Sequence, residues 1–211
     1  MTIGQALWSF ALLAGVLTII PGMNTTLVLR SALTQSRGYA YVTALGIATG
    51  TLIWGVAAAL GAAALLAASE VAFTALKLVG AAYLIYVGVT MIVASFRRVE
   101  VFTEAQVKPS ASLWTAFGRG LLTDLLNPKV GVFYMALIPQ FIPPGVPPAG
   151  MGLLLALVHV AETLVWFSAI IFATSFAKRW LSSARVTRWI DRVTGGILIA
   201  FGAVLALESR P

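Results

Sequence analysis

The sequence contains no cysteine and a single histidine, His159. Without cysteine the chain can form neither a disulfide framework nor thiolate ligands to a metal, and one histidine cannot build a site of several imidazoles. We therefore expect no metal site, and nothing in the residue pattern indicates another cofactor.

Charged residues are also scarce. They make up 10% of the 211 residues, against 60% hydrophobic residues, and the mean hydropathy is +0.96. This balance is far from that of a soluble domain and predicts an integral membrane protein surrounded by the lipid bilayer. The net charge of +7 does not indicate a nucleic-acid partner, because membrane proteins with several spans carry Lys and Arg in their cytoplasmic loops for reasons of topology.

Six apolar segments are long enough to cross a membrane. A transmembrane helix needs about 20 apolar residues for the roughly 30 Å hydrocarbon layer, and unpaired backbone groups exclude most other structures there. The segments cover residues 4–29, 40–68, 71–95, 113–142, 150–176 and 190–208. No Lys or Arg precedes the first segment, so it lacks the basic start of a cleaved signal peptide and is expected to remain as the first helix.

The basic residues indicate how these helices are oriented. Eleven of the 14 basic residues fall in alternate connections. They are Arg30 and Arg37 after the first helix, Arg97, Arg98, Lys108 and Arg119 after the third, and Lys178, Arg179, Arg185, Arg188 and Arg192 after the fifth. The connections near Glu70 and at 142–150 contain neither Lys nor Arg. By the positive-inside rule the basic connections are cytoplasmic, and both termini are expected outside.

The two halves of the chain share three short matches. "TLIW" (51–54) recurs as "TLVW" (163–166), "AAYLIYVGV" (81–89) resembles "GGILIAFGA" (195–203), and Pro21 has a counterpart in Pro128, with offsets of 112, 114 and 107. Matches in the same order at similar offsets indicate that the chain arose by duplication. Because each half has three helices, an odd number, the second half would enter the membrane in the opposite orientation to the first. We predict one transmembrane domain over 1–211, with inverted repeats near 1–96 and 113–211 and a cytoplasmic linker at 97–112.

The first and fourth helices are predicted to be interrupted by proline, at "TIIPGMNTTLVLR" (18–30) and "LLNPKVGVF" (125–133). A proline inside a helix costs about 3 kcal/mol or more, and in lipid the freed carbonyls need other partners. Such a break is tolerated where it lines a cavity or where neighbouring helices repair it. Asn127 and Pro128 suit the cap and first turn of a new half-helix, and Asn24 offers similar capping chemistry to the first break.

Paired breaks indicate a transporter's binding site, because the start of a half-helix presents free N–H groups to an anion such as a substrate carboxylate. The alternative is that both prolines are packing kinks. The candidate substrate-binding residues are Pro21, Gly22, Asn24, Thr25, Asp124, Asn127, Pro128 and Lys129. Asp124 lies one turn before Asn127, where it would accept a proton, bind a substrate amino group or pair with a cation. Lys129 either meets a carboxylate or extends to the surface.

Glu162 is the leading candidate for proton coupling, because an ionisable group near the middle of a membrane helix is costly. His159 lies three positions earlier, close enough on a helix to share a proton with it, and Asp124 is a further candidate. A carboxyl at this depth would hold a proton and release it when water returns. The alternative is that Glu162 stays neutral and only joins helices.

The same stretches resemble a known family. "TIIPGMNTTLVLRSALTQSRGYAYVTALGIATG" and "FGRGLLTDLLNPKVGVFYMALIPQFI" are similar to two motifs of the lysine exporter and homoserine/threonine resistance (LysE/RhtB) family, and "LKLVGAAYLIYVGVTMI" looks like its third helix. The resemblance implies a multi-pass bacterial inner-membrane exporter of amino acids or related metabolites, driven by the proton gradient. Met23 departs from the family, which often has a second proline there.

The combined prediction is an all-α, six-helix secondary carrier in which one half rocks against the other. Three alternatives remain open: a non-transporting assembly or signalling subunit, a channel, and an intramembrane enzyme. The enzyme would need Glu162 and Asp124 as a carboxylate pair, since no other nucleophile, base or metal cluster can be assembled. The residue pattern is compatible with a homo-oligomer but does not determine the number of copies.

Overall fold

The computed structural model describes residues 1–96, 112–174 and 183–207, and this part of the chain is helical. Its elements are α1 (Ile3–Ile19), α2 (Met23–Thr34), α3 (Arg37–Ala68), α4 (Glu70–Ala94), α5 (Leu113–Leu125), α6 (Pro128–Leu137), the short 3-10 helix η1 (Ile138–Phe141), α7 (Pro148–Phe172) and α9 (Ala184–Leu207). Side-chain hydrogen bonds from neighbouring residues determine where several helices begin. Thr2 and Gln5 form a reciprocal capping box ahead of α1, and the Ser112 side chain caps α5.

The helices are those of a membrane protein. Within the described ranges, α3, α4 and α7 are each long and apolar enough to cross a bilayer, and two bent pairs bring the number of candidate spans to at most five. The pairs are α1 with α2, bent by 54°, and α5 with α6 and η1, bent by 55°. The sixth predicted span, 190–208, falls on α9 up to Leu207 and stays a prediction, as does the cytoplasmic linker at 97–112, of which all but Ser112 lies outside the described residues.

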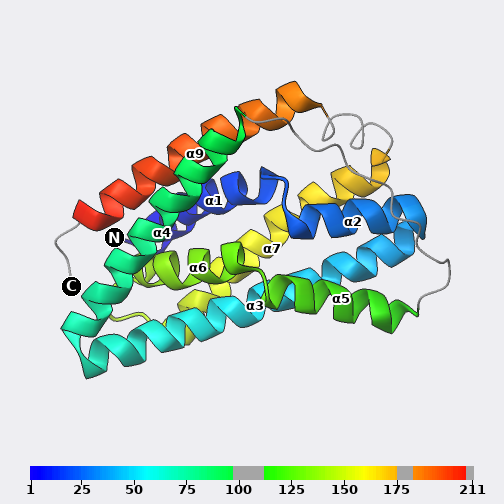
Figure 1. Ribbon diagram of the computed structural model, residues 1–211. Helices are drawn as coiled ribbons and strands as arrows, with labels where there is room; N and C mark the ends of the chain where they lie inside the picture. Colours follow the sequence, from blue (N-terminus) through cyan, green and yellow to red (C-terminus); the bar gives the residue numbers. More distant parts are fainter. Residues whose placement is uncertain (97–111, 175–182, 208–211) are drawn as a thin grey trace.

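Two groups of helices make up the molecule (Figure 1). The long helix α3 packs along α5 on one side and α7 on the other, while α4 packs along α9 and also contacts α6. The start of α1, the end of α9 and the turn between α3 and α4 gather at one end of the bundle in Figure 1. The turn between α2 and α3 lies at the opposite end, with the start of α5.

Glycines allow α3 to approach its neighbours closely. A Cβ on Gly46 would overlap the carbonyl oxygen of Phe117 in α5, and one on Gly120 would overlap that of Thr43 in α3. Between α3 and α7, a Cβ on Gly55 would stand 2.8 Å from the carbonyl oxygen of Gly152. These helices therefore touch backbone to backbone, and the packing fixes the depth at which their polar side chains lie.

Two apolar clusters form the interior. The first joins α1, α6, η1 and α7 around Phe10, Phe133 and Tyr134, with contributions from α3, α4 and α9. The second joins α2, α3 and α7 around Val28 and Ile171. Large apolar side chains also point outward, including Trp8 and Leu12 on α1, as expected of a surface that meets lipid.

Candidate functional site

The break between α1 and α2 leaves the start of α2 without a side-chain cap. Gly22 is the N-cap residue, in extended backbone, and no side chain accepts a hydrogen bond from the first turn. The capping role predicted for Asn24 is wrong. Its amide nitrogen Nδ2 instead donates a hydrogen bond to Asp124 Oδ1, 2.7 Å away in α5.

The break between α5 and α6 has the cap that its residues predict. Asn127 Oδ1 accepts a hydrogen bond from the backbone N–H of Lys129 at 3.1 Å, and Pro128 is the first residue of α6. The helix is pre-organised at this point, because proline has no N–H to leave unpaired and its fixed φ suits the first turn. The two breaks thus differ: α6 is capped by its own chain, and α2 is not.

A polar network joins the two breaks. Asp124 is completely buried. In addition to the bond from Asn24, it accepts one from Thr51 Oγ1 of α3 at 3.3 Å. Asn127 Nδ2 extends the network by donating a hydrogen bond to Asn24 Oδ1 at 3.5 Å. Asn24 therefore binds one oxygen of Asp124 and Thr51 binds the other. These hydrogen bonds link α2, α3 and α5.

Gly50 makes room for the Asp124 carboxylate. A Cβ at this position of α3 would stand 2.7 Å from Asp124 Oδ2 and 2.9 Å from Asp124 Cβ, closer than side-chain atoms pack. Gly50 and Thr51 are not among the site residues predicted from the sequence. Their roles depend on which helix α3 faces, and a single sequence carries no signal for that pairing.

We expect Gly50→Ala to lower export at least tenfold, because the new methyl group must displace the carboxylate from its two hydrogen-bond donors. Gly118→Ala is the matched control, since a Cβ on Gly118 of α5 has nothing within 4 Å. Solute efflux measured at equal membrane abundance compares the two variants. Equal export by both would show that the position of Asp124 does not matter for transport.

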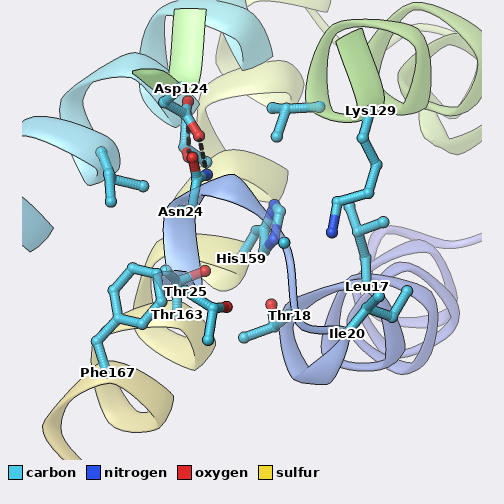
Figure 2. Close-up of a pocket in the computed structure, with 14 residues that line it drawn as sticks. Leu17, Thr18, Ile20, Asn24, Thr25, Asp124, Lys129, His159, Thr163 and Phe167 are labelled. Atoms are coloured by element: carbon cyan, nitrogen blue, oxygen red, sulfur yellow. Dashed lines mark hydrogen bonds between the residues drawn. The ribbon is translucent and has the colours of Figure 1, made fainter. Parts of the chain in front are cut away.

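Residues from both broken helices line a cavity next to this network (Figure 2). Of the predicted substrate-binding residues, Gly22, Asn24, Thr25, Asp124 and Lys129 line it. Asn127 lies one hydrogen bond away through Asn24, and Pro21 lies at the first break without lining the cavity. Pro128 begins α6. Leu17, Ile20 and Val130 of the first apolar cluster lie on one side, and Ile47 and Phe167 of the second lie on another.

Lys129 lines this cavity and its ammonium group points into it, so the alternative in which its side chain extends to the surface does not apply. Its side chain leaves α6 and enters from the side opposite Asp124 (Figure 2). A Cβ on Gly22 would stand 3.1 Å from Lys129 Nζ, so the ammonium lies at the uncapped start of α2. Among the described residues, none forms a hydrogen bond or ion pair with this ammonium.

His159 also lines the cavity, but its hydrogen-bond partner is not the predicted one. His159 Nδ1 lies 2.9 Å from the hydroxyl of Tyr134 in α6. The two rings stack, and Phe10 and Phe133 pack against them with ring centroids 5.9–6.4 Å from His159. The histidine therefore joins the cavity to the first apolar cluster.

Glu162 points away from the cavity, toward α1. A Cβ on Gly15 of α1 would stand 3.7 Å from Glu162 Oε1 and 3.8 Å from Oε2. Oε2 is buried and has no hydrogen-bond partner among the described residues. Thr18, three residues after Gly15 on α1, reaches the cavity from the same helix. The carboxyl thus occupies the seam between α1 and α7, next to the cavity but outside it.

Comparison with known proteins supports a transport role for the chain. A family model described as LysE type translocator matches residues 16–209. The chain is 32% identical to the uncharacterized membrane protein YrhP of Bacillus subtilis, over 97% of this chain and 100% of that protein. It is 27% identical to the threonine efflux protein of Escherichia coli, over 89% and 91%, and 27% identical to the leucine efflux protein of an Enterobacter species, over 94% of each. No solved structure matches the chain.

Proposed function

We propose that this chain, which belongs to the LysE type translocator family, is a secondary active exporter of amino acids or related small metabolites. The observation that carries the proposal is a cavity with one carboxylate, Asp124, and one ammonium group, Lys129, on opposite sides. A free amino acid carries the complementary pair of charges. The threonine and leucine efflux relatives agree with this substrate class.

The two charges divide the recognition of an amino acid between them. The substrate ammonium would bind Asp124, whose oxygens are already oriented by Asn24 and Thr51. The substrate carboxylate would bind Lys129 and the N–H groups at the uncapped start of α2, where the helix dipole also favours a negative charge. Charge-assisted hydrogen bonds of this kind are the stronger ones, so both ends of the substrate would be fixed.

An inverted duplication would give the carrier two conformations, one open to each side of the membrane. The α4–α9 contacts support it, because a Cβ on Gly88 would meet the Gly195 carbonyl and Ile199, while one on Gly202 would meet the Ala81 carbonyl and Ile85. Adding 114 to 81, 85 and 88 gives 195, 199 and 202, so exchanging the halves maps one contact onto the other. We propose one transporter domain over 1–211, in which the repeats rock against each other around the cavity.

The same duplication relates the two places where a carboxyl rests on a glycine of a neighbouring helix. With the offset of 112 taken from "TLIW" and "TLVW", Gly50 of α3 corresponds to Glu162 of α7. Both carboxyls belong to the second repeat: Asp124 rests on Gly50 of the first repeat, and Glu162 rests on Gly15 of the first repeat. Each carboxyl occupies the seam between a broken helix and a long one. We propose that Glu162 carries the proton and that the chain is a proton-driven antiporter.

The proposed location is the bacterial inner membrane, with both termini outside. Supporting this topology, the start of α1 and the end of α9 lie at the same end of the bundle (Figure 1). Arg37 begins α3 at the opposite end, where the positive-inside rule places the cytoplasm. Reporter fusions at 143–149 and at 35–37 test the orientation, and cytoplasmic signal from 143–149 would overturn it.

The function is tested by efflux from cells preloaded with a panel of amino acids, with and without an uncoupler. We expect at least one amino acid to leave faster from cells that express the chain, and the uncoupler to suppress the difference. A channel would give flux that saturates poorly and ignores the gradient. An enzyme would convert the solute, and an assembly subunit would move none. Any of these three results would contradict the proposal.

A further inference from the structure

One ionisable side chain in the cavity, His159 of α7, has no role in the proposed function. The residue is buried and lines the cavity. Aromatic neighbours enclose its ring. Tyr134 of α6 stacks on it with the two ring planes 19° apart, and Phe10 and Phe133 pack against it with centroids 6.4 and 5.9 Å away. Because side chains in such an interior are closely packed, the two ring nitrogens keep fixed directions.

The first ring nitrogen, Nδ1, accepts a hydrogen bond from within the protein. It lies 2.9 Å from the hydroxyl of Tyr134. Tyr134 is completely buried, and within the described part of the chain its hydroxyl has no other hydrogen-bond partner. The hydroxyl proton therefore has Nδ1 as its acceptor, because a buried donor without an acceptor is unfavourable. An imidazole that accepts at Nδ1 is neutral and carries its own proton on the second nitrogen, Nε2.

The second ring nitrogen, Nε2, faces the cavity. It forms no hydrogen bond with any residue that the structure describes, and it is not one of the unpaired polar atoms that are fully buried there. Since His159 is buried and lines the cavity, this accessible nitrogen directs its N–H into the cavity. Figure 2 shows the ring between Asn24 and Lys129.

A fixed N–H donor suits the carboxylate end of an amino acid. The substrate ammonium has donors only, so it cannot accept a hydrogen bond from Nε2–H. Lys129 supplies the opposite charge for the carboxylate, but an ammonium on a flexible stem is a point charge with rotatable donors. Lys129 therefore attracts the carboxylate without fixing its orientation. A second donor whose direction is set by packing would fix that orientation.

We propose that His159 donates a hydrogen bond from Nε2–H to the carboxylate of the substrate, and that Tyr134 is the positioning residue that holds this tautomer. This inference rests on the proposed function, because it needs an amino acid whose ammonium binds Asp124 and whose carboxylate meets Lys129. It gives His159 a role in substrate binding in place of the proton coupling predicted from its spacing to Glu162.

The test measures binding of threonine and of leucine to the purified full-length chain by isothermal titration. His159→Gln and His159→Met introduce side chains of similar length, but only glutamine keeps an N–H donor near the place of Nε2. We expect the Kd of a bound amino acid to rise at least tenfold in His159→Met and to stay within threefold of the wild-type value in His159→Gln. If His159 only packs in the apolar cluster, methionine would serve at least as well as glutamine. Wild-type affinity in His159→Met would overturn the proposal.

Amines without a carboxyl group show at which end of the substrate the affinity is lost. The probes are 1-amino-2-propanol and 3-methylbutylamine, which are threonine and leucine without their carboxyl groups. We expect the Kd of the amine to differ by less than threefold between the wild type and His159→Met. Equal losses for the amino acid and its amine would contradict the proposal, because they would indicate damage to the whole cavity.

Tyr134→Phe tests the positioning role, because it keeps the stacked ring and removes the hydroxyl that fixes the tautomer. We expect the Kd of the amino acid to rise at least threefold in the wild-type background and not to rise further in His159→Met, where the donor is already absent. An equal rise in both backgrounds would contradict this role. The double variant leaves no buried hydroxyl unpaired, so it replaces His159→Met if that variant folds poorly. If the wild type binds neither amino acid, the proposed function fails first; if it binds one and His159→Met binds it equally well, only this inference fails.

Discussion

Asp124→Asn is expected to lower export of the substrate sharply while leaving the protein folded in the membrane. Asparagine has nearly the same shape as aspartate, and the introduced amide oxygen still accepts the hydrogen bond that Asn24 donates. Thr51 donates to the other oxygen at 3.3 Å, and its hydroxyl can rotate to accept instead. The substitution therefore removes the negative charge without removing the network.

The size of the effect follows from the bond that the substrate ammonium would lose. A hydrogen bond between charged groups contributes about 1.5–3 kcal/mol, and every 1.4 kcal/mol is about a factor of ten in affinity. We expect affinity to fall about 10- to 100-fold, and transport at low substrate concentration to fall with it. Substrate binding to the purified protein and efflux at equal abundance measure the two quantities.

Two further variants identify the cause of the loss. Asp191→Asn removes a carboxylate from α9, outside the cavity, and is expected to leave export unchanged. Lys129→Gln removes the opposite charge of the cavity and should also lower affinity. Wild-type export by Asp124→Asn would contradict the assignment of the cavity as the substrate site.

The prediction of helix breaks at Pro21 and Pro128 rests on local causes. Proline disrupts a helix through its own ring, which lacks the N–H and clashes with the preceding turn. Asn127 before Pro128 has the residue types that begin a new helix. The same reasoning was wrong for Asn24, which has the chemistry of a cap but donates across the cavity to Asp124. The choice between these partners depends on how α2 packs against α5. The residue types of a single sequence do not show which helices pack together.

Helical spacing was also too coarse for the pairing of His159 with Glu162. Residues three apart on a helix differ by about 60° around its axis, which is enough for them to meet different neighbours. His159 faces Tyr134 of α6, and Glu162 faces Gly15 of α1. Their proximity along the sequence predicted one shared site, whereas the fold gives each residue its own.

Glu162→Gln is expected to abolish the part of export that depends on the proton gradient, with insertion and abundance unchanged. Glutamine fills the same space beside Gly15 but cannot bind and release a proton. The described α1 residues that face Glu162 contribute no ionisable side chain, and on α7 the neighbouring His159 is bound to Tyr134. A proton that reaches the seam between α1 and α7 therefore has Glu162 as its acceptor there.

The measurement separates coupling from substrate movement. In proteoliposomes with an imposed pH gradient, wild-type protein should concentrate the substrate, and Glu162→Gln should reach only equal concentrations on the two sides, while exchange of labelled for unlabelled substrate continues. Glu162→Asp retains a carboxyl and should keep part of the accumulation. If Glu162 only joins helices, glutamine would serve as well, and gradient-driven accumulation would survive the substitution. That result would move the coupling role to Asp124, the carboxyl that rests on Gly50 in the corresponding seam between α3 and α5.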